Sequence, residues 1–128
     1  MPILLVDDCQ SVLDVVRAIL ERIGFNQIDE AADGVSALKR FKTRKYGLVI
    51  SDWNMRPMDG YELLRQIRGD ELLCTTPFIM MTTEGQASLL VKAKQADLNH
   101  LIIKPFTPSV LRKRIESICG ELQLQGII

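Results

Sequence analysis

Five short apolar runs divide the chain and restrict the folds that it can adopt. They occupy residues 3–6, 28–32, 48–51, 78–82 and 101–103, and the second is the weakest. The other four are continuous rather than alternating in polarity, which is typical of parallel strands that are buried on both faces. The runs therefore predict a parallel β-sheet that is covered on both sides.

Helical patterns fill the segments between these runs. The first helix is predicted between a start signal at Ser11 and Asp14 and a stop at Gly24. Four more are indicated by apolar residues at helical spacing: Ala37, Leu38 and Phe41; Leu64 and Ile67; Leu89 or Leu90 with Ala93 and Ala96; and Leu111, Ile115, Ile118 and Leu122. The order strand–helix thus occurs five times, and right-handed crossovers turn it into a doubly wound α/β sheet.

The composition limits the classes of protein to consider. A chain of 128 residues suits one domain, and its sixteen basic and sixteen acidic residues cancel, so no strong overall field would draw it to DNA or to a membrane surface. No apolar run approaches the roughly 20 residues of a membrane helix, and the N-terminus has no basic leader. Three widely spaced cysteines favour free thiols, with Cys9 expected to be buried and inert. We expect a cytoplasmic protein.

Polar residues follow four of the five predicted strands. Asp7-Asp8 ends the first, Asp52 the third, Thr82 the fourth and Lys104 the fifth. Ligands of open parallel sheets bind beyond the carboxyl ends of the strands, and a flavodoxin-like order 2-1-3-4-5 would bring these four strand ends together. Each signal alone has an ordinary structural explanation, but four complementary groups at four strand ends indicate a site.

These residue types point to phosphoryl chemistry. Crowded carboxylates repel one another unless a cation lies among them, and hard oxygen ligands at an open site favour Mg²⁺, with Mn²⁺ as the alternative. A carboxylate beside such an ion can attack a phosphoryl group to give an aspartyl phosphate. The hydroxyl of Thr82 and the ammonium of Lys104 could then hold the phosphoryl oxygens.

The motifs of the chain resemble those of response regulator receiver domains along its whole length. The resemblance lies in Leu4-Leu5-Val6-Asp7-Asp8, Ser51-Asp52-Trp53-Asn54-Met55, Met58-Asp59-Gly60 and Lys104-Pro105-Phe106-Thr107. The string Asp-Trp-Asn-Met is most similar to the chemotaxis regulators of the CheY kind. The resemblance assigns residues 1–121 to the receiver domain and 122–128 to a C-terminal tail.

The resemblance also implies roles for individual residues. Asp52 would be the phosphoacceptor, assisted by Thr82 and Lys104. The metal ion would be bound by Asp8, Asp52 and the backbone carbonyl of Asn54, and through water by Asp7. Asn54 and Glu84 match positions that flank the attacking water during dephosphorylation, and Lys104-Pro105 matches a cis peptide bond of the family.

Two positions depart from the family pattern. The family's Met-Pro-x-Met-Asp-Gly is here Met55-Arg56-Pro57-Met58-Asp59-Gly60, with the proline one place late, which puts the loop path in question. Arg56 is either a solvated surface residue or a recognition residue. In the fifth strand, Leu101 replaces an aromatic switch residue, so rotation of a tyrosine ring cannot be the read-out.

The resemblance implies a single-domain response regulator. It would accept a phosphoryl group from a histidine kinase, lose it by self-catalysed hydrolysis, and signal to an unknown output protein as a monomer without direct contact to DNA or membranes. The output surface would comprise the fourth helix, fifth strand and fifth helix, with Leu90 and Leu101 as apolar anchors. The burial of Leu90 stays open between core and surface.

Three other classes fit parts of the sequence less well. A phosphatase or phosphotransferase with an aspartate nucleophile usually carries a second aspartate two residues later, where this chain has Asn54. A nucleotide or flavin carrier needs a phosphate-binding loop after the first strand, where Asp7-Asp8 would repel phosphate. A receiver that only binds proteins would not need an intact acidic pocket.

Overall fold

The structure is a computed structural model that describes residues 1–83, 85 and 87–124, with side chains up to residue 120. Within this part of the chain, five strands alternate with five helices. The strands are β1 (Ile3–Val6), β2 (Ile28–Ala31), β3 (Leu48–Asp52), β4 (Phe78–Thr82) and β5 (His100–Ile103). The helices are α1 (Gln10–Ile23), α2 (Gly34–Phe41), α3 (Gly60–Arg68), α4 (Ala87–Gln95) and α5 (Pro108–Leu124). Each predicted strand and helix is therefore present.

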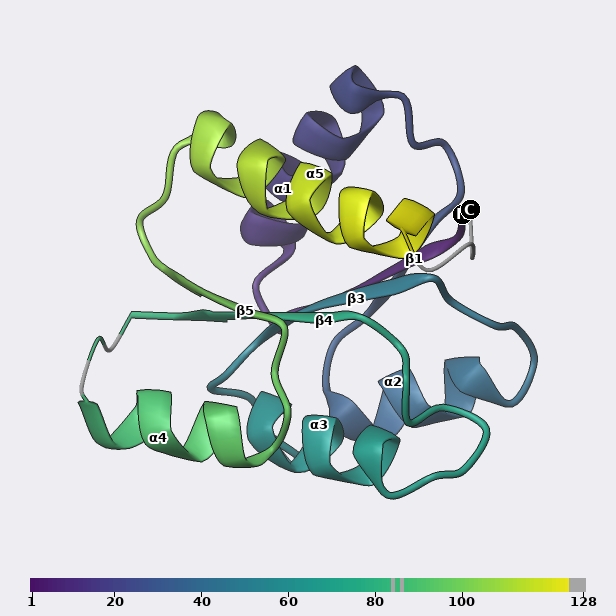
Figure 1. Ribbon diagram of the computed structural model, residues 1–128, viewed down its shortest axis with the longest axis vertical. Coiled ribbons are helices and arrows are strands. Elements are labelled where there is room, and N and C mark those ends of the chain that lie inside the picture. Colours follow the sequence, from purple (N-terminus) through teal and green to yellow (C-terminus); the bar gives the residue numbers. More distant parts are fainter. Residues whose placement is uncertain (84, 86, 125–128) are drawn as a thin grey trace.

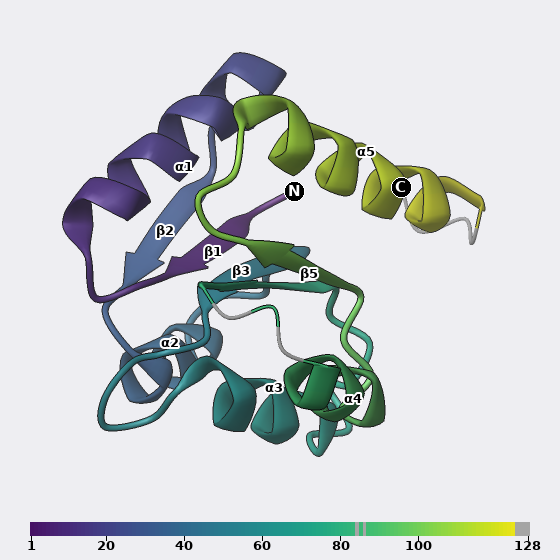
Figure 2. The ribbon, with the colours of Figure 1, turned by 90° about the vertical axis from the view of Figure 1, so that its left-hand side faces the viewer.

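The strands form one parallel sheet in the order β2-β1-β3-β4-β5, as the strand ends predicted. Helices α1 and α5 cover one face, and α2, α3 and α4 cover the other (Figure 1), which the turned view in Figure 2 also shows. No helix within the described residues is long and apolar enough to cross a membrane.

The two faces of the sheet bury separate apolar clusters. Ile3 and Leu5 of β1 belong to the cluster between the sheet and helices α1 and α5. Leu4 and Val6 belong to the cluster between the sheet and helices α2, α3 and α4. The central strands β1, β3 and β4 are buried at every position, which explains their continuous apolar sequences. The outer strands β2 and β5 are only partly buried, because each has a neighbour on one side alone.

Side-chain caps open α2 and α3, whereas α1 does not begin at its predicted start. The carboxylates of Asp33 and Asp59 cap α2 and α3. Each accepts a hydrogen bond from the backbone amide of the third residue of its helix, Ser36 in α2 and Glu62 in α3. Helix α1, however, begins at Gln10, so the predicted start at Ser11 is wrong. Its N-cap is Cys9, which is exposed rather than buried as we expected. Gly24 ends α1 in the left-handed conformation, as predicted.

Gly60 allows α3 to begin directly beneath the end of β3. Its amide donates a hydrogen bond of 2.9 Å to the carbonyl oxygen of Trp53. A methyl group at Gly60 would overlap the carbonyl oxygen of Asp52 and crowd the sulfur of Met80. The close approach of α3 to the end of β3 therefore requires a residue without a side chain.

Replacing Gly60 by alanine should lower the free energy of unfolding by about 1–3 kcal/mol, because the backbone of β3 has to move to accept the methyl group. The matched control is Gly120→Ala in α5, where the new methyl group meets no described atom within 4 Å beyond its chain neighbours and the nearby backbone of its own helix. That variant should gain about 0.5–1 kcal/mol from helix propensity. Urea unfolding curves measure both changes, and equal midpoints for the two variants would contradict the close approach.

Candidate functional site

Three carboxylates meet at the carboxyl edge of the sheet. Asp7 and Asp8 follow β1, and Asp52 is the last residue of β3, the strand beside β1. Each offers an oxygen, and these oxygens all lie within 4.8 Å of one another. Asp7 and Asp52 are buried, with 1% and 8% of their surfaces exposed, whereas Asp8 is open to solvent. The structure thus brings together the three acids that the sequence singled out.

Lys104 inserts its ammonium group among these carboxylates. It follows β5, and its side chain reaches across β4 to place Nζ 3.2 Å from Asp7 Oδ2 and 3.1 Å from Asp52 Oδ1. Its backbone amide donates to the carbonyl oxygen of Thr82 at 2.7 Å, which fixes the start of the loop after β5. With all four groups ionised, three negative charges and one positive charge leave a formal charge of −2.

Burial and the neighbouring Lys104 act in opposite directions on the pKa of Asp52. Burial, the largest influence, raises the pKa of Asp52, and the charge of Asp7 adds to this, while the hydrogen bond and charge of Lys104 lower it without reversing the shift. For Lys104, burial alone would lower the pKa, but its contacts with Asp52 and Asp7 outweigh burial and raise it. Lys104 therefore keeps its positive charge. That charge offsets only part of the cost of ionising the buried carboxyl group of Asp52.

Two of the remaining predicted site residues, Thr82 and Asn54, belong to the described part of the chain. Thr82 is the fully buried last residue of β4, next to β3 in the sheet. Asn54 is exposed in the loop that follows Asp52. Glu84 lies outside the described residues, so its predicted role in dephosphorylation stays a prediction.

The loop from β3 to α3 departs from the family sequence but is fixed at three points. The amide of Trp53 donates to Met81 at 2.8 Å, its carbonyl accepts from Gly60, and the carbonyl of Met58 accepts from Gly34 at 3.1 Å. Arg56-Pro57 is cis, as is Lys104-Pro105, which was the predicted cis bond. Arg56 is exposed, which favours its interpretation as a surface residue.

An apolar surface lies over α4 and β5. Leu90, Val91 and Ile103 are 42%, 54% and 51% exposed, so Leu90 belongs to the surface rather than to the core. Leu101 is half-buried and packs against the cluster between the sheet and helices α2, α3 and α4, which also contains Ala93 of α4. Of the two predicted anchors, one is exposed and the other lies between surface and core.

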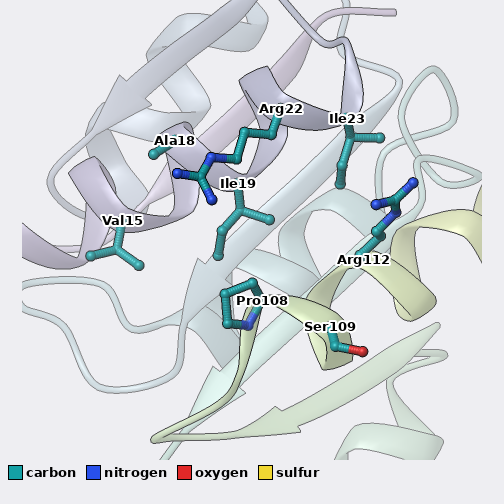
Figure 3. A pocket seen from close by; sticks show the side chains of 8 residues that line it. All are labelled: Val15, Ala18, Ile19, Arg22, Ile23, Pro108, Ser109 and Arg112. Carbon is teal, nitrogen blue, oxygen red and sulfur yellow. The ribbon is translucent and has the colours of Figure 1, made fainter.

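A separate groove runs between α1 and α5 on the opposite face of the sheet (Figure 3). Apolar side chains of both helices form its floor, and the guanidinium groups of Arg22 and Arg112 flank it. Its lining residues are Val15, Ala18, Ile19, Arg22, Ile23, Pro108, Ser109 and Arg112. It contains none of the predicted site residues, so we do not assign the phosphoryl chemistry to it.

Two residues beside the acid cluster have contacts that the sequence did not reveal. The amide of Gly60 and its missing side chain position the end of β3. The ring of Tyr61 stacks on Trp53, the neighbour of Asp52. Spacing along the chain gave no signal for either contact, because both depend on how α3 folds back on β3.

Comparison with known proteins places the chain in a family. The family of response regulator receiver domains matches residues 3–116. The chemotaxis protein CheY-3 of Vibrio cholerae is 40% identical over 122 residues, which covers 95% of this chain and 94% of the relative. The chemotaxis protein CheY of Pseudomonas aeruginosa is 38% identical over 118 residues, which covers 92% and 95%. The chain therefore belongs to the response regulator receiver domains.

Solved structures agree with this assignment. The chemotaxis response regulator CheY4 of Vibrio cholerae matches with a TM-score of 0.84 and 31% identity, over 91% of this chain and 97% of that chain. The receiver domain of a Pseudomonas aeruginosa sensor histidine kinase, solved with a magnesium ion coordinated in the active site cleft, matches with a TM-score of 0.83 and 28% identity, over 93% and 97%. The protein is thus a CheY-like receiver domain, the phosphoaccepting module of a signalling switch.

The charge cluster generates a prediction for stability. Because the folded-state pKa of Asp52 lies above the unfolded value, its ionised form costs the folded protein free energy. This cost is absent at low pH, appears as the pH rises above about 4, and is constant once the folded-state pKa is passed. Asp52→Asn should therefore raise the free energy of unfolding at pH 7 in EDTA by about 1 kcal/mol, as measured by denaturant titration.

Exposed Asp14 supplies the control, since Asp14→Asn keeps an oxygen to accept the hydrogen bond from Gln10 and should change stability by no more than about 0.5 kcal/mol. Added Mg²⁺ should stabilise the parent more than Asp52→Asn, because an ion that binds only the native state shifts unfolding by mass action. A less stable Asp52→Asn variant in EDTA would show that Lys104 overcompensates the acids.

Proposed function

We propose that this receiver domain takes a phosphoryl group from a histidine kinase onto Asp52, and that the phosphorylated form acts on an output protein through the α4–β5–α5 surface. The observation that carries the proposal is the double ion pair of Lys104 with Asp7 and Asp52, with Asp8 beside them. This arrangement combines a buried nucleophile, a fixed cation and an acidic pocket at one strand edge.

The donor set fits a small divalent cation. Three carboxylates and one ammonium leave a formal charge of −2, which a divalent ion balances, and oxygen ligands at a site that is partly open to solvent suit Mg²⁺ or Mn²⁺. Asp8, Asp52 and the backbone carbonyl of Asn54 would hold the ion directly, and Asp7 would hold it through water. The ion supplies positive charge for the phosphoryl oxygens.

The protein residues provide the nucleophile and the stabilising contacts. A carboxylate oxygen of Asp52 attacks phosphorus; an O–P bond forms and the bond between phosphorus and the donor's leaving atom breaks, with the electron pair leaving on that atom. Lys104 then pairs with a phosphoryl oxygen in place of the Asp52 oxygen, and the hydroxyl of Thr82 donates to another.

The aspartyl phosphate is removed by water. Attack of water on phosphorus breaks the O–P bond and returns Asp52 as a carboxylate with inorganic phosphate as the product. Asn54, two residues from the acceptor, and Glu84 are proposed to orient this water. Catalysis is then limited to the protein's own phosphorylation and dephosphorylation, so the chain is a switch rather than an enzyme acting on other molecules.

The proposed output is a change of packing rather than of fold. Phosphorylation draws Thr82 toward Asp52, and Leu101 moves further into the space that Thr82 leaves. Leu101 has no hydroxyl to pair at either position, so the two packings differ less sharply than they would with a tyrosine. A partner that binds the repacked surface better than the unphosphorylated surface then shifts the population toward it. We propose that the protein, with residues 1–121 as its receiver domain and 122–128 as its tail, acts as a monomer and does not contact DNA itself.

Acetyl phosphate should phosphorylate the protein at Asp52 only when Mg²⁺ or Mn²⁺ is present, because the metal ion neutralises the acidic pocket. Intact-mass spectra measure the added phosphoryl group, and a tenfold or greater loss of labelling is expected in EDTA and in Asp52→Asn. Asp59→Asn serves as the control, since it keeps the cap of α3 and should label like the parent. Equal labelling of Asp52→Asn and the parent would contradict the proposed acceptor.

Beryllofluoride, a phosphoryl mimic, should change the amide chemical shifts along a path from Asp52 through Thr82 to Leu101 and α4. Two-dimensional NMR spectra with and without the mimic measure the path, and Thr82→Val should remove the change at Leu101. Changes confined to α1 and α2 would contradict the proposed output surface.

A further inference from the structure

An aromatic pair joins the acceptor loop to α3. The rings of Trp53 and Tyr61 are stacked, with centroids 5.5 Å apart and planes at 11°. Trp53 is 7% exposed and directly follows Asp52, while Tyr61 lies in the first turn of α3 and is half-buried. Stacked pairs at this distance favour their partnered arrangement over a separated one by about two- to tenfold.

Trp53 is bonded to β4 and to α3 directly beside the acceptor. Its backbone amide is bound to Met81 of β4 and its carbonyl to Gly60 at the start of α3, and both bonds adjoin the backbone of Asp52. A change in the loop beside Asp52 therefore changes the position of the Trp53 ring. The stack passes that change to Tyr61.

Two cations lie over the ring of Tyr61, and they come from different helices. Arg65 belongs to α3, one turn after Tyr61, and its guanidinium carbon is 6.0 Å from the ring centroid. Lys92 belongs to α4, and its Nζ is also 6.0 Å from the centroid. Only the Lys92 contact links two elements. At exposed positions such a contact changes a population by about two- to fivefold, which is enough to bias a switch without locking it.

The apolar cluster between the sheet and helices α2, α3 and α4 also connects the acceptor loop with α3 and α4. It contains Trp53 and Ala93, and Tyr61 and Leu101 pack against it. The position of Leu101 lacks an aromatic ring, whereas the stack supplies two rings between the acceptor and α4. An aromatic connection to α4 is therefore present in this chain, but it runs through α3 instead of β5.

We propose that the stack of Trp53 on Tyr61, held against α4 by Lys92, transmits the state of Asp52 to α4, with Tyr61 as the positioning residue. The proposal rests on the function proposed above, in which Asp52 is the acceptor. It adds a second route to α4 that does not pass through Thr82 and Leu101.

The test compares four variants of the full chain. Tyr61→Phe keeps the ring, Tyr61→Leu removes it, Lys92→Met removes the charge from α4, and Arg65→Met removes the charge from α3. Each is titrated with Mg²⁺ and beryllofluoride, whose binding is measured by ¹⁹F NMR, and the amide shift changes of α4 are measured at saturation. Circular dichroism confirms that each variant is folded.

Parent, Tyr61→Phe and Arg65→Met should show the same response of α4. Tyr61→Leu and Lys92→Met should bind the mimic but show an α4 response that is at least twofold smaller. A full response of α4 in Lys92→Met or in a folded Tyr61→Leu overturns the proposal. If Tyr61→Leu does not fold, Lys92→Met alone decides the test, because Lys92 is exposed and its replacement leaves the core intact. Absence of binding in the parent overturns the proposed acceptor function instead, and the inference with it.

Discussion

Lys104 connects three strands of the sheet through one ammonium group. Its backbone follows the edge strand β5, and its side chain extends over β4 to the carboxylate of Asp52 at the end of β3 and that of Asp7 just after β1. Without this cation, Asp7 and Asp52 would be two buried like charges on neighbouring strands, which few folds tolerate. One positive charge only partly compensates three negative ones. The carboxyl edge of the sheet therefore keeps a net negative charge that favours binding of a further cation. The same ammonium group is the one proposed to pair with a phosphoryl oxygen, so the proposed chemistry uses the group that stabilises the pocket.

The sheet determines where this pocket forms. All five strands are parallel, so their carboxyl ends share one edge, and the order β2-β1-β3-β4-β5 places the ends of β1 and β3 side by side at its centre. Apolar residues fill both faces of these strands, and the acids can approach solvent only at the edge. This topology therefore buries Asp52, the proposed nucleophile, and leaves the proposed metal site beside it open to solvent. The close approach of Gly60 then brings the start of α3 against the same edge.

The sequence was sufficient to predict the fold and the grouping of Asp7, Asp8, Asp52 and Lys104, because continuous apolar runs and polar strand ends are local signals that the topology merely assembles. It failed where the outcome depends on packing between distant segments. Ser11 carries a good capping signal, but the turn after β1 already aligns the chain at Cys9, whose amide binds Asp7. The stack of Trp53 on Tyr61 joins two residues across a loop with a cis proline, and no periodicity records such a contact.

The consequences of replacing the aromatic switch residue follow from where Leu101 and Tyr61 lie. Both pack against the cluster between the sheet and α4, so a change on either side of that cluster alters the surface on which α4 rests. A leucine can fill the space beside Thr82 but cannot hold two alternative hydrogen-bonded positions, so the movement proposed for Leu101 is graded. A stacked ring under a lysine from the neighbouring helix adds a directional contact that a leucine lacks. In the switch proposed for this chain, therefore, α4 responds through the contacts of α3 as well as through those of β5.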